Sequence, residues 1–253
     1  MSSIIYGIHP VREALLSSTV PVKKILISTK HPSPSLQSVI DLAQQKSVPL
    51  TFVEREVLDQ KVKRGPHQNV LAIVDEIPYA SLEEILQRPK QEGTQALLLV
   101  LDGIQDPQNL GSLIRTGLGC GAHGVILPKD RAAGITPAVV KASAGATAHL
   151  PVARVVNIAA TIDRLKEEGL WVYGASGEAE EVLYDLDFKT DLAIVIGAEG
   201  KGIRPLVKKK CDRLFSIPMK GPVSSFNAAV SGAMILYEAM RQRGFRGERG
   251  ELR

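Results

Sequence analysis

The sequence predicts an α/β protein built from two units, the second of which contains a parallel sheet. Residues 1–76 alternate short apolar runs with amphipathic stretches, as in a small α/β unit. Residues 96–101 are then apolar at every position, which is typical of a strand covered on both faces of a parallel sheet. Strand-like runs alternate with helix-like stretches from there on, so we expect ligands to bind at the carboxyl ends of the strands.

The composition is that of a globular protein and excludes few functions. Of the 253 residues, 44% are hydrophobic and 23% are charged. The net charge of +4 favours an anionic partner only weakly, because 31 basic residues are balanced by 27 acidic ones. No apolar run approaches the roughly 18 residues of a membrane helix, and no signal peptide precedes the first structured segment, so we expect a cytoplasmic protein. Cys120 and Cys211 form no CxxC pattern, which predicts free, buried thiols and no metal site.

The first unit, residues 1–76, has apolar runs at 4–6, 24–27, 50–52, 57–62 and 70–74, with helices predicted over 10–17 and 35–46. Basic side chains crowd one turn near its end: Lys61, Lys63, Arg64 and His67. Lys and Arg contact nucleic-acid phosphates without reading the sequence, so this turn is a candidate phosphate-binding patch. A solvated loop without such a role is an equally good interpretation.

Residues 77–94 are predicted to be an interdomain linker, because two prolines and a glycine surround a single helix-like piece at 82–86. The second unit covers residues 95–243. After its first strand the chain passes through a polar loop, and Asn109 is predicted to cap a helix over 110–119. Arg115 lies off the apolar stripe of that helix, where a solvated side chain is the simplest interpretation. Further strands are expected at 125–127 and 171–175, and further helices at 137–143 and 157–168.

A glycine-rich loop follows the apolar run 192–196. Gly197, Gly200 and Gly202 surround one carboxylate, Glu199, and glycine permits both positive φ angles and a close approach of backbone to a ligand. A strand at 214–217 leads to the polar residues 224–227, which are predicted to cap a long final helix. The loops at 102, 197 and 218 are therefore expected to enclose one pocket. No dinucleotide fingerprint, P-loop, nucleophile elbow or HExxH motif is present.

Three separated segments resemble the motifs of a known family. They are residues 102–111 (DGIQDPQNLG) with Arg115, residues 196–200 (IGAEG), and residues 217–219 (IPM) with 225–227 (SFN). Together they are similar to the three motifs of the SpoU/TrmH methyltransferases, members of the SPOUT class that transfer a methyl group from S-adenosylmethionine to a ribose 2′-hydroxyl of RNA. Residues 6–15 (YGIHPVREAL), 67–68, 129–131 and 141–146 resemble the bacterial 23S rRNA guanosine-2′-O-methyltransferases.

The resemblance implies a deep trefoil knot in the second unit and a ribosomal-protein-like RNA-binding domain in the first. It implies a homodimer packed through the knot region, no metal, and RNA, most simply 23S rRNA, as partner. The implied catalytic residues are Arg115, Asn109, Glu199 and Asn227. The implied residues for binding S-adenosylmethionine are Gly197, Ile217, Met219, Ser225 and Phe226, of which Phe226 departs from the family's usual Leu. A tRNA or adenosine target and a non-catalytic ribosome-assembly factor are the alternatives.

Arg115 has two conceivable roles in such a reaction. A guanidinium pKa above about 12 opposes a role as general base, so electrostatic stabilisation of the developing alkoxide is favoured, with deprotonation as the alternative. The final helix presents Phe226, Val230, Ala233, Met234 and Tyr237 on one face and is the expected dimer interface; a helix packed only on its own sheet is the alternative. Gly232 within it predicts close packing against another element. Residues 244–253 are expected to form a flexible basic tail.

Overall fold

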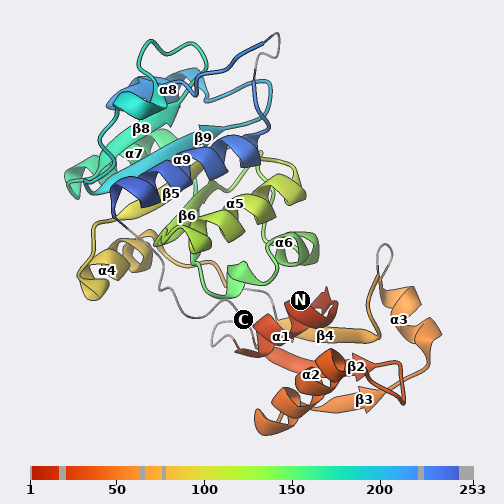
Figure 1. The fold of residues 1–253 in the computed structure, drawn as a ribbon. Helices are drawn as coiled ribbons and strands as arrows, with labels where there is room; N and C mark the ends of the chain where they lie inside the picture. Colours follow the sequence, from red (N-terminus) through yellow and green to blue (C-terminus); the bar gives the residue numbers. More distant parts are fainter. Residues whose placement is uncertain (1, 17–20, 63–65, 76–77, 222–224, 245–253) are drawn as a thin grey trace.

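The computed structural model describes residues 2–16, 21–62, 66–75, 78–221 and 225–244, which form two separate sheets with their helices (Figure 1). Most of the expected basic tail, together with Lys63, Arg64 and Ser224, lies outside the described residues. Every helix of the described part is too short or too polar to cross a lipid bilayer.

The smaller sheet belongs to residues 2–75. Its strands are ordered β1 (Ser2–Tyr6), β4 (Val70–Asp75), β2 (Val22–Ile27) and β3 (Leu50–Phe52), and only the β2–β3 pair is parallel. Helices α1 (Ile8–Leu16) and α2 (Pro34–Gln45) bury apolar side chains on one face. Helix α3 (Arg55–Lys61), which takes up most of the apolar run at 57–62, packs Leu58 on the other face.

The larger sheet is parallel, as predicted, and has six strands, of which the last, at residues 152–155, was not predicted from the sequence. Their order is β10 (Arg213–Phe215), β8 (Trp171–Ala175), β9 (Leu192–Gly197), β5 (Leu97–Asp102), β6 (Gly124–Pro128) and β7 (Val152–Val155). The central pair is β9 and β5, in a register that places Asp102 beside Gly197 at their carboxyl ends. The two loops that leave these strands therefore start side by side.

Helices cover both faces of the larger sheet (Figure 1). One face carries α5 (Pro107–Gly119), α6 (Pro137–Ala142) and α9 (Ala228–Gln242). The other carries α4 (Leu82–Glu92), α7 (Ile158–Glu167) and α8 (Pro205–Lys210). Strand β5 serves both cores, since Leu97, Leu99 and Leu101 face the first layer and Leu98 and Val100 the second. This double burial explains its apolar sequence.

The segment predicted as a linker contributes to the larger core. Its helix α4 reaches Glu92 instead of residue 86, and it begins with a capping box formed by Ser81 and Glu84. Ile85 is fully buried against Gly124, where a Cβ atom would lie 2.5 Å from the Ile85 side chain. The helix was underestimated because Pro89 indicated a break, whereas this proline lies near the end of the helix and is itself buried.

The two sheet units touch through α1 and β1 on one side and α6 and the 3₁₀ turn η1 (Ala146–Ala148) on the other. Val140 and Ala148 belong to the core of the smaller unit. His149 Nε2 lies 3.0 Å from Glu13 Oε2, and Lys141 Nζ lies 4.8 Å from the centre of the Tyr6 ring. Apolar burial and these polar contacts together hold the smaller unit against the face that carries α6.

Candidate active site

The glycine-rich loop after β9 is shaped by two different properties of glycine. At Gly197 an added Cβ would lie 2.0 Å from the carbonyl carbon of Gly202, so the backbone passes too close for any side chain. Gly200 and Gly202 have φ angles of 75° and 64°, in the left-handed region that glycine adopts freely. Ala198 and Gly202 close the loop with a pair of backbone hydrogen bonds of 3.2 and 2.8 Å. The glycine-rich loop predicted from the sequence is therefore present.

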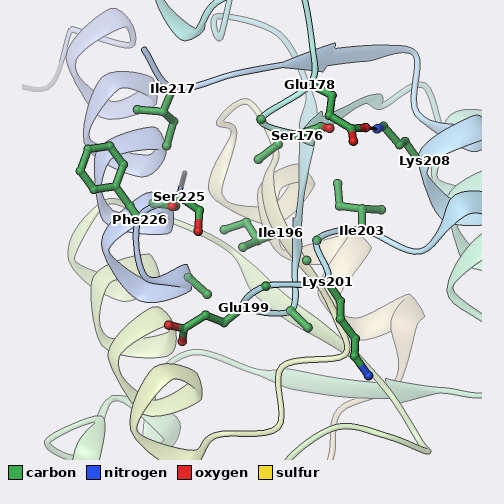
Figure 2. A pocket seen from close by; sticks show the side chains of 18 of the residues that line it. Ser176, Glu178, Ile196, Glu199, Lys201, Ile203, Lys208, Ile217, Ser225 and Phe226 are labelled. Atoms are coloured by element: carbon green, nitrogen blue, oxygen red, sulfur yellow. Dashed lines mark hydrogen bonds and ion pairs between the residues drawn. The ribbon is translucent and has the colours of Figure 1, made fainter. Parts of the chain in front are cut away.

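A cavity of about 560 Å³ opens beside this loop, at the carboxyl ends of β8, β9 and β10. This volume is within the range of roughly 300–1,000 Å³ that is usual for ligand pockets. Figure 2 shows Ile217 and Phe226 on the side of α9, with Ser176, Glu178 and Lys208 across from them. The cavity is lined by all five residues implied to bind the cofactor: Gly197, Ile217, Met219, Ser225 and Phe226.

Three polar side chains meet beside the cavity, although they are far apart in the sequence. Asn227 Nδ2 donates to Asn109 Oδ1 at 2.9 Å and to Glu199 Oε2 at 3.2 Å, and Asn109 Nδ2 donates to the same Glu199 oxygen at 3.3 Å. Asn227 also caps α9, because its Oδ1 accepts the N–H groups of Ala229 and Val230. The start of α9 is thus tied to both loops.

The predicted capping role of Asn109 is wrong. Helix α5 begins at Pro107, and its cap is Asp106, whose carboxylate accepts the N–H of Asn109 at 3.0 Å. Proline suits the first turn of a helix, where its missing N–H is not needed. Because Asp106 does the capping, the Asn109 side chain is available for Glu199 and Asn227.

Of the four implied catalytic residues, Arg115 is the one that makes no hydrogen bond with the other three. Its side chain is exposed on α5 and has no hydrogen-bond or ion-pair partner among the described residues. It is not among the residues that line the cavity. The interpretation of Arg115 as a solvated side chain therefore holds within one subunit.

Sequence analysis missed a charged pair at the cavity. Lys208 Nζ lies 2.7 Å from Glu178 Oε2, and this hydrogen bond and the lysine charge lower the pKa of Glu178. Residues 174–178 (GASGE) fail the GxSxG nucleophile-elbow pattern at their last position, and no other role was predicted for them. Its position just after β8 was the signal, since ligands gather at the carboxyl ends of parallel strands.

The candidate phosphate patch loses one member in the structure. His67 is buried, with Nε2 2.9 Å from Asp59 Oδ1 and Nδ1 accepting the N–H of Asn69 at 3.0 Å. It therefore orders its own turn and is not offered to solvent. Cys120 and Cys211 are free and half-buried, and the described residues contain no group of three or more potential metal ligands.

Comparison with known proteins identifies the family. The SpoU rRNA methylase family matches residues 96–237, and the family of RNA 2′-O ribose methyltransferase substrate-binding domains matches residues 4–80. RlmB of Pseudomonas putida, a 23S rRNA (guanosine-2′-O-)-methyltransferase, is 42% identical over 242 residues, which are 94% of this chain and 96% of RlmB. YacO of Bacillus subtilis, which is named as a TrmH family tRNA/rRNA methyltransferase, is 45% identical over 84% of this chain and 85% of its own length.

Solved structures agree with these matches. The SpoU methyltransferase AviRb of Streptomyces viridochromogenes, in complex with AdoMet, has a TM-score of 0.81 and 28% identity, covering 96% of this chain and 90% of AviRb. The chain belongs to the SpoU rRNA methylase family. It is an RNA 2′-O-methyltransferase that uses S-adenosylmethionine, so the resemblance and the cofactor expected from the sequence are confirmed.

The cavity suits this cofactor in shape and polarity. The Gly197 loop forms one wall, and Ile196, Phe215 and Ile217 offer apolar surface for a flat base. Glu178 and Lys208 add one charge of each sign at the far side, which suits the polar remainder of the molecule.

Proposed function

We propose that this enzyme methylates the ribose 2′-hydroxyl of a guanosine in 23S rRNA. The observation that carries the proposal is the cluster of Asn109, Glu199 and Asn227 beside the glycine-lined cavity. It occurs in a chain that matches RlmB over nearly its whole length. A ribosomal substrate also accords with the cytoplasmic location expected from the sequence. Methylation of a tRNA, or of an adenosine, would replace this proposal.

The cofactor is proposed to bind in the cavity beside the Gly197 loop. When bound, S-adenosylmethionine supplies an activated methyl group on a sulfonium centre. The Gly197 backbone and the apolar walls of Ile217, Met219 and Phe226 would hold it, with Ser225 lining the same site. The larger Phe226 side chain, where the family has Leu, would narrow the adenine side of the cavity.

The three clustered polar residues are proposed to position the target ribose. Glu199 keeps a second carboxylate oxygen free of the contacts to Asn109 and Asn227, and this oxygen is able to accept a ribose hydroxyl. Asn109 and Asn227 fix the carboxylate from two directions, so little reorganisation is needed when the substrate arrives. Positioning of this kind supplies much of the rate in transfers that bring two substrates together.

Arg115 is proposed to reach the site of a second subunit in a homodimer. Its guanidinium is exposed, and α5, which carries it, packs beside α9. Helix α9 leaves Val230, Met234 and Tyr237 exposed at 44%, 37% and 63%, a candidate apolar interface. Across that interface Arg115 would hold an RNA phosphate and stabilise the developing alkoxide.

Two features of the fold are part of the same proposal. Residues 95–243 would form the catalytic domain, with a deep trefoil knot around the cavity, and residues 1–76 would bind RNA. The match of residues 4–80 to substrate-binding domains supports the second assignment. Residues 77–94 would connect the two, although their helix α4 packs on the catalytic sheet.

Labelled S-adenosylmethionine tests the proposal directly. Incubation with 23S rRNA fragments should give label on a guanosine ribose, mapped by nuclease digestion and mass spectrometry. Label on tRNA, or on an adenosine, would replace the proposed substrate. RNA binding without any label, at saturating cofactor, would favour the non-catalytic assembly factor.

Ile217→Asp tests the proposed place of the cofactor. A charge in the apolar wall should weaken S-adenosylmethionine binding about tenfold or more in calorimetry, because an unpaired charge opposes burial of the base. Unchanged affinity would move the cofactor elsewhere.

A further inference from the structure

A buried carboxylate next to the active site has no part in the chemistry described so far. Asp102 ends β5, and its side chain has no exposed surface. Buried carboxylates are tolerated when they are paired and hydrogen-bonded. Asp102 is satisfied by one residue, since Arg204 donates its backbone N–H to Oδ2 at 2.8 Å and its Nε–H to Oδ1 at 2.7 Å, with Nη2 also against Oδ1.

The pair joins the two loops that carry the clustered polar residues. Asp102 starts the loop that leads to Asn109 and is in register with Gly197 on the neighbouring strand. Arg204 lies two residues after Gly202, the end of the glycine-rich loop, and is the N-cap residue of α8. One end of the glycine-rich loop is therefore held by the strand pairing at Gly197, and the other by the contacts of Arg204 with Asp102.

Between these anchors the loop is held mainly through one side chain, Glu199, which accepts from Asn109 and Asn227. Gly200 and Gly202 are left-handed, and an added Cβ at either would meet no atom within 4 Å, so no side chain packs over this side of the two glycines. Glycine is free to adopt many other conformations, and Lys201 between them is exposed. The hydrogen bonds between Ala198 and Gly202 close the loop on itself without fixing it to the sheet.

We infer that Asp102 and Arg204 are positioning residues that hold the 197–202 loop in the shape the cofactor requires and set Glu199 opposite Asn109. The inference rests on the proposed place of S-adenosylmethionine beside Gly197 and Ile217. The backbone N–H contact matters here, because it positions the main chain of the loop end, which a pairing of side chains alone would not do. Breaking the pair should release the loop while leaving β5 and β9 paired.

The alternative is that the pair only adds stability, and a second ion pair on the same helix provides the matched control. Lys210 of α8 donates to both carboxylate oxygens of Asp163 on α7 at 2.8 Å, on the side of α8 that faces α7. Lys210→Gln removes a salt bridge from α8 without touching the loop. It should lower the melting temperature only slightly, because both side chains are partly exposed, and leave cofactor affinity unchanged.

The experiment measures calorimetric Kd for S-adenosylmethionine and the cofactor-free melting temperature of the full chain. Arg204→Gln and Asp102→Asn should each raise Kd about tenfold, the effect of losing one charge-assisted hydrogen bond that orders the loop. Both variants at position 204 keep the backbone N–H, and Arg204→Lys, which also keeps a cation for Asp102, should recover part of the affinity. Asp102→Asn leaves no unpaired buried charge, so it tests the inference even if Arg204→Gln folds poorly.

Three outcomes would overturn the inference that Asp102 and Arg204 hold the loop for the cofactor. A lowered melting temperature with Kd within about twofold of wild type would make the pair purely structural and overturn the inference. Weak binding by Ile217→Asp but normal binding by the Asp102 and Arg204 variants would overturn the inference alone. Normal binding by Ile217→Asp would overturn the proposed cofactor site, and the inference with it.

Discussion

Asn227 joins two roles that substitution is able to separate. Its Oδ1 caps α9 through the N–H groups of Ala229 and Val230, while its Nδ2 donates to Asn109 and Glu199. Asn227→Ala removes both roles. Asn227→Asp keeps an oxygen for the cap but has no N–H to donate, and it places a carboxylate beside Glu199.

The contacts that each substitution removes set the expected changes in melting temperature and in the rate of methyl transfer. Loss of an N-cap costs about 1 kcal/mol, which lowers the melting temperature of a chain of this length by roughly 2–4 °C, so Asn227→Ala should melt lower by that amount. Asn227→Asp should melt near wild type. Both lose two hydrogen bonds to the cluster, worth about 1 kcal/mol each, which corresponds to a roughly 30-fold lower rate of methyl transfer.

The assay pairs differential scanning calorimetry with single-turnover transfer of labelled methyl to rRNA. Asn157→Ala is the matched control, because Asn157 caps α7 by accepting the N–H of Ala160 at 3.3 Å on the opposite face of the sheet. It should lower the melting temperature as Asn227→Ala does, with normal transfer. Full activity of Asn227→Asp would refute the claim that the amide organises Glu199.

Three further predictions concern the subunit contact, Arg115 and one thiol. Arg115→Ala should slow methyl transfer about 100-fold, because the guanidinium would no longer stabilise the developing alkoxide. The melting temperature should not change, because the Arg115 side chain is exposed and unpaired in the described part of the subunit. A normal rate of transfer would remove Arg115 from catalysis. Met234→Glu with Tyr237→Glu should yield a monomer of 27.3 kDa in light scattering, whereas a monomeric wild type would contradict the proposed dimer. Burial raises the pKa of Cys211 from 9.0 to about 12. Iodoacetamide at about pH 8.5 should therefore label this thiol only after unfolding. Labelling of the native protein would show that the thiol is accessible.

The raised pKa of Cys211 also has a consequence for stability. The folded state holds this proton more tightly than the unfolded state, so the stabilising contribution is complete below the unfolded pKa of 9.0. It is lost as the pH rises from there toward about 12. Removing the thiol with Cys211→Ala should therefore make the alkaline unfolding curve less steep in this range.

Much of the fold was predictable because its signals are local. The uniform apolar run of β5, the glycines after β9 and the capping polar residue before α9 each follow from the conformational preferences of a few adjacent residues. The larger role of α4 was not predictable in this way, since Pro89 and Gly93 also occur in linkers. What decides is the burial of Ile85 against Gly124 in β6, a contact between distant residues.

The sequence by itself determined the alternation of strands and helices, the parallel sheet, the glycine-rich loop and, through three motifs, the family. Only the tertiary structure decided that Glu178 meets Lys208 and that Arg115 does not line the cavity of its own subunit. The reason is physical: side chains from separate loops meet only where strand order and register bring those loops together. The spacing of residues along one segment does not encode this arrangement.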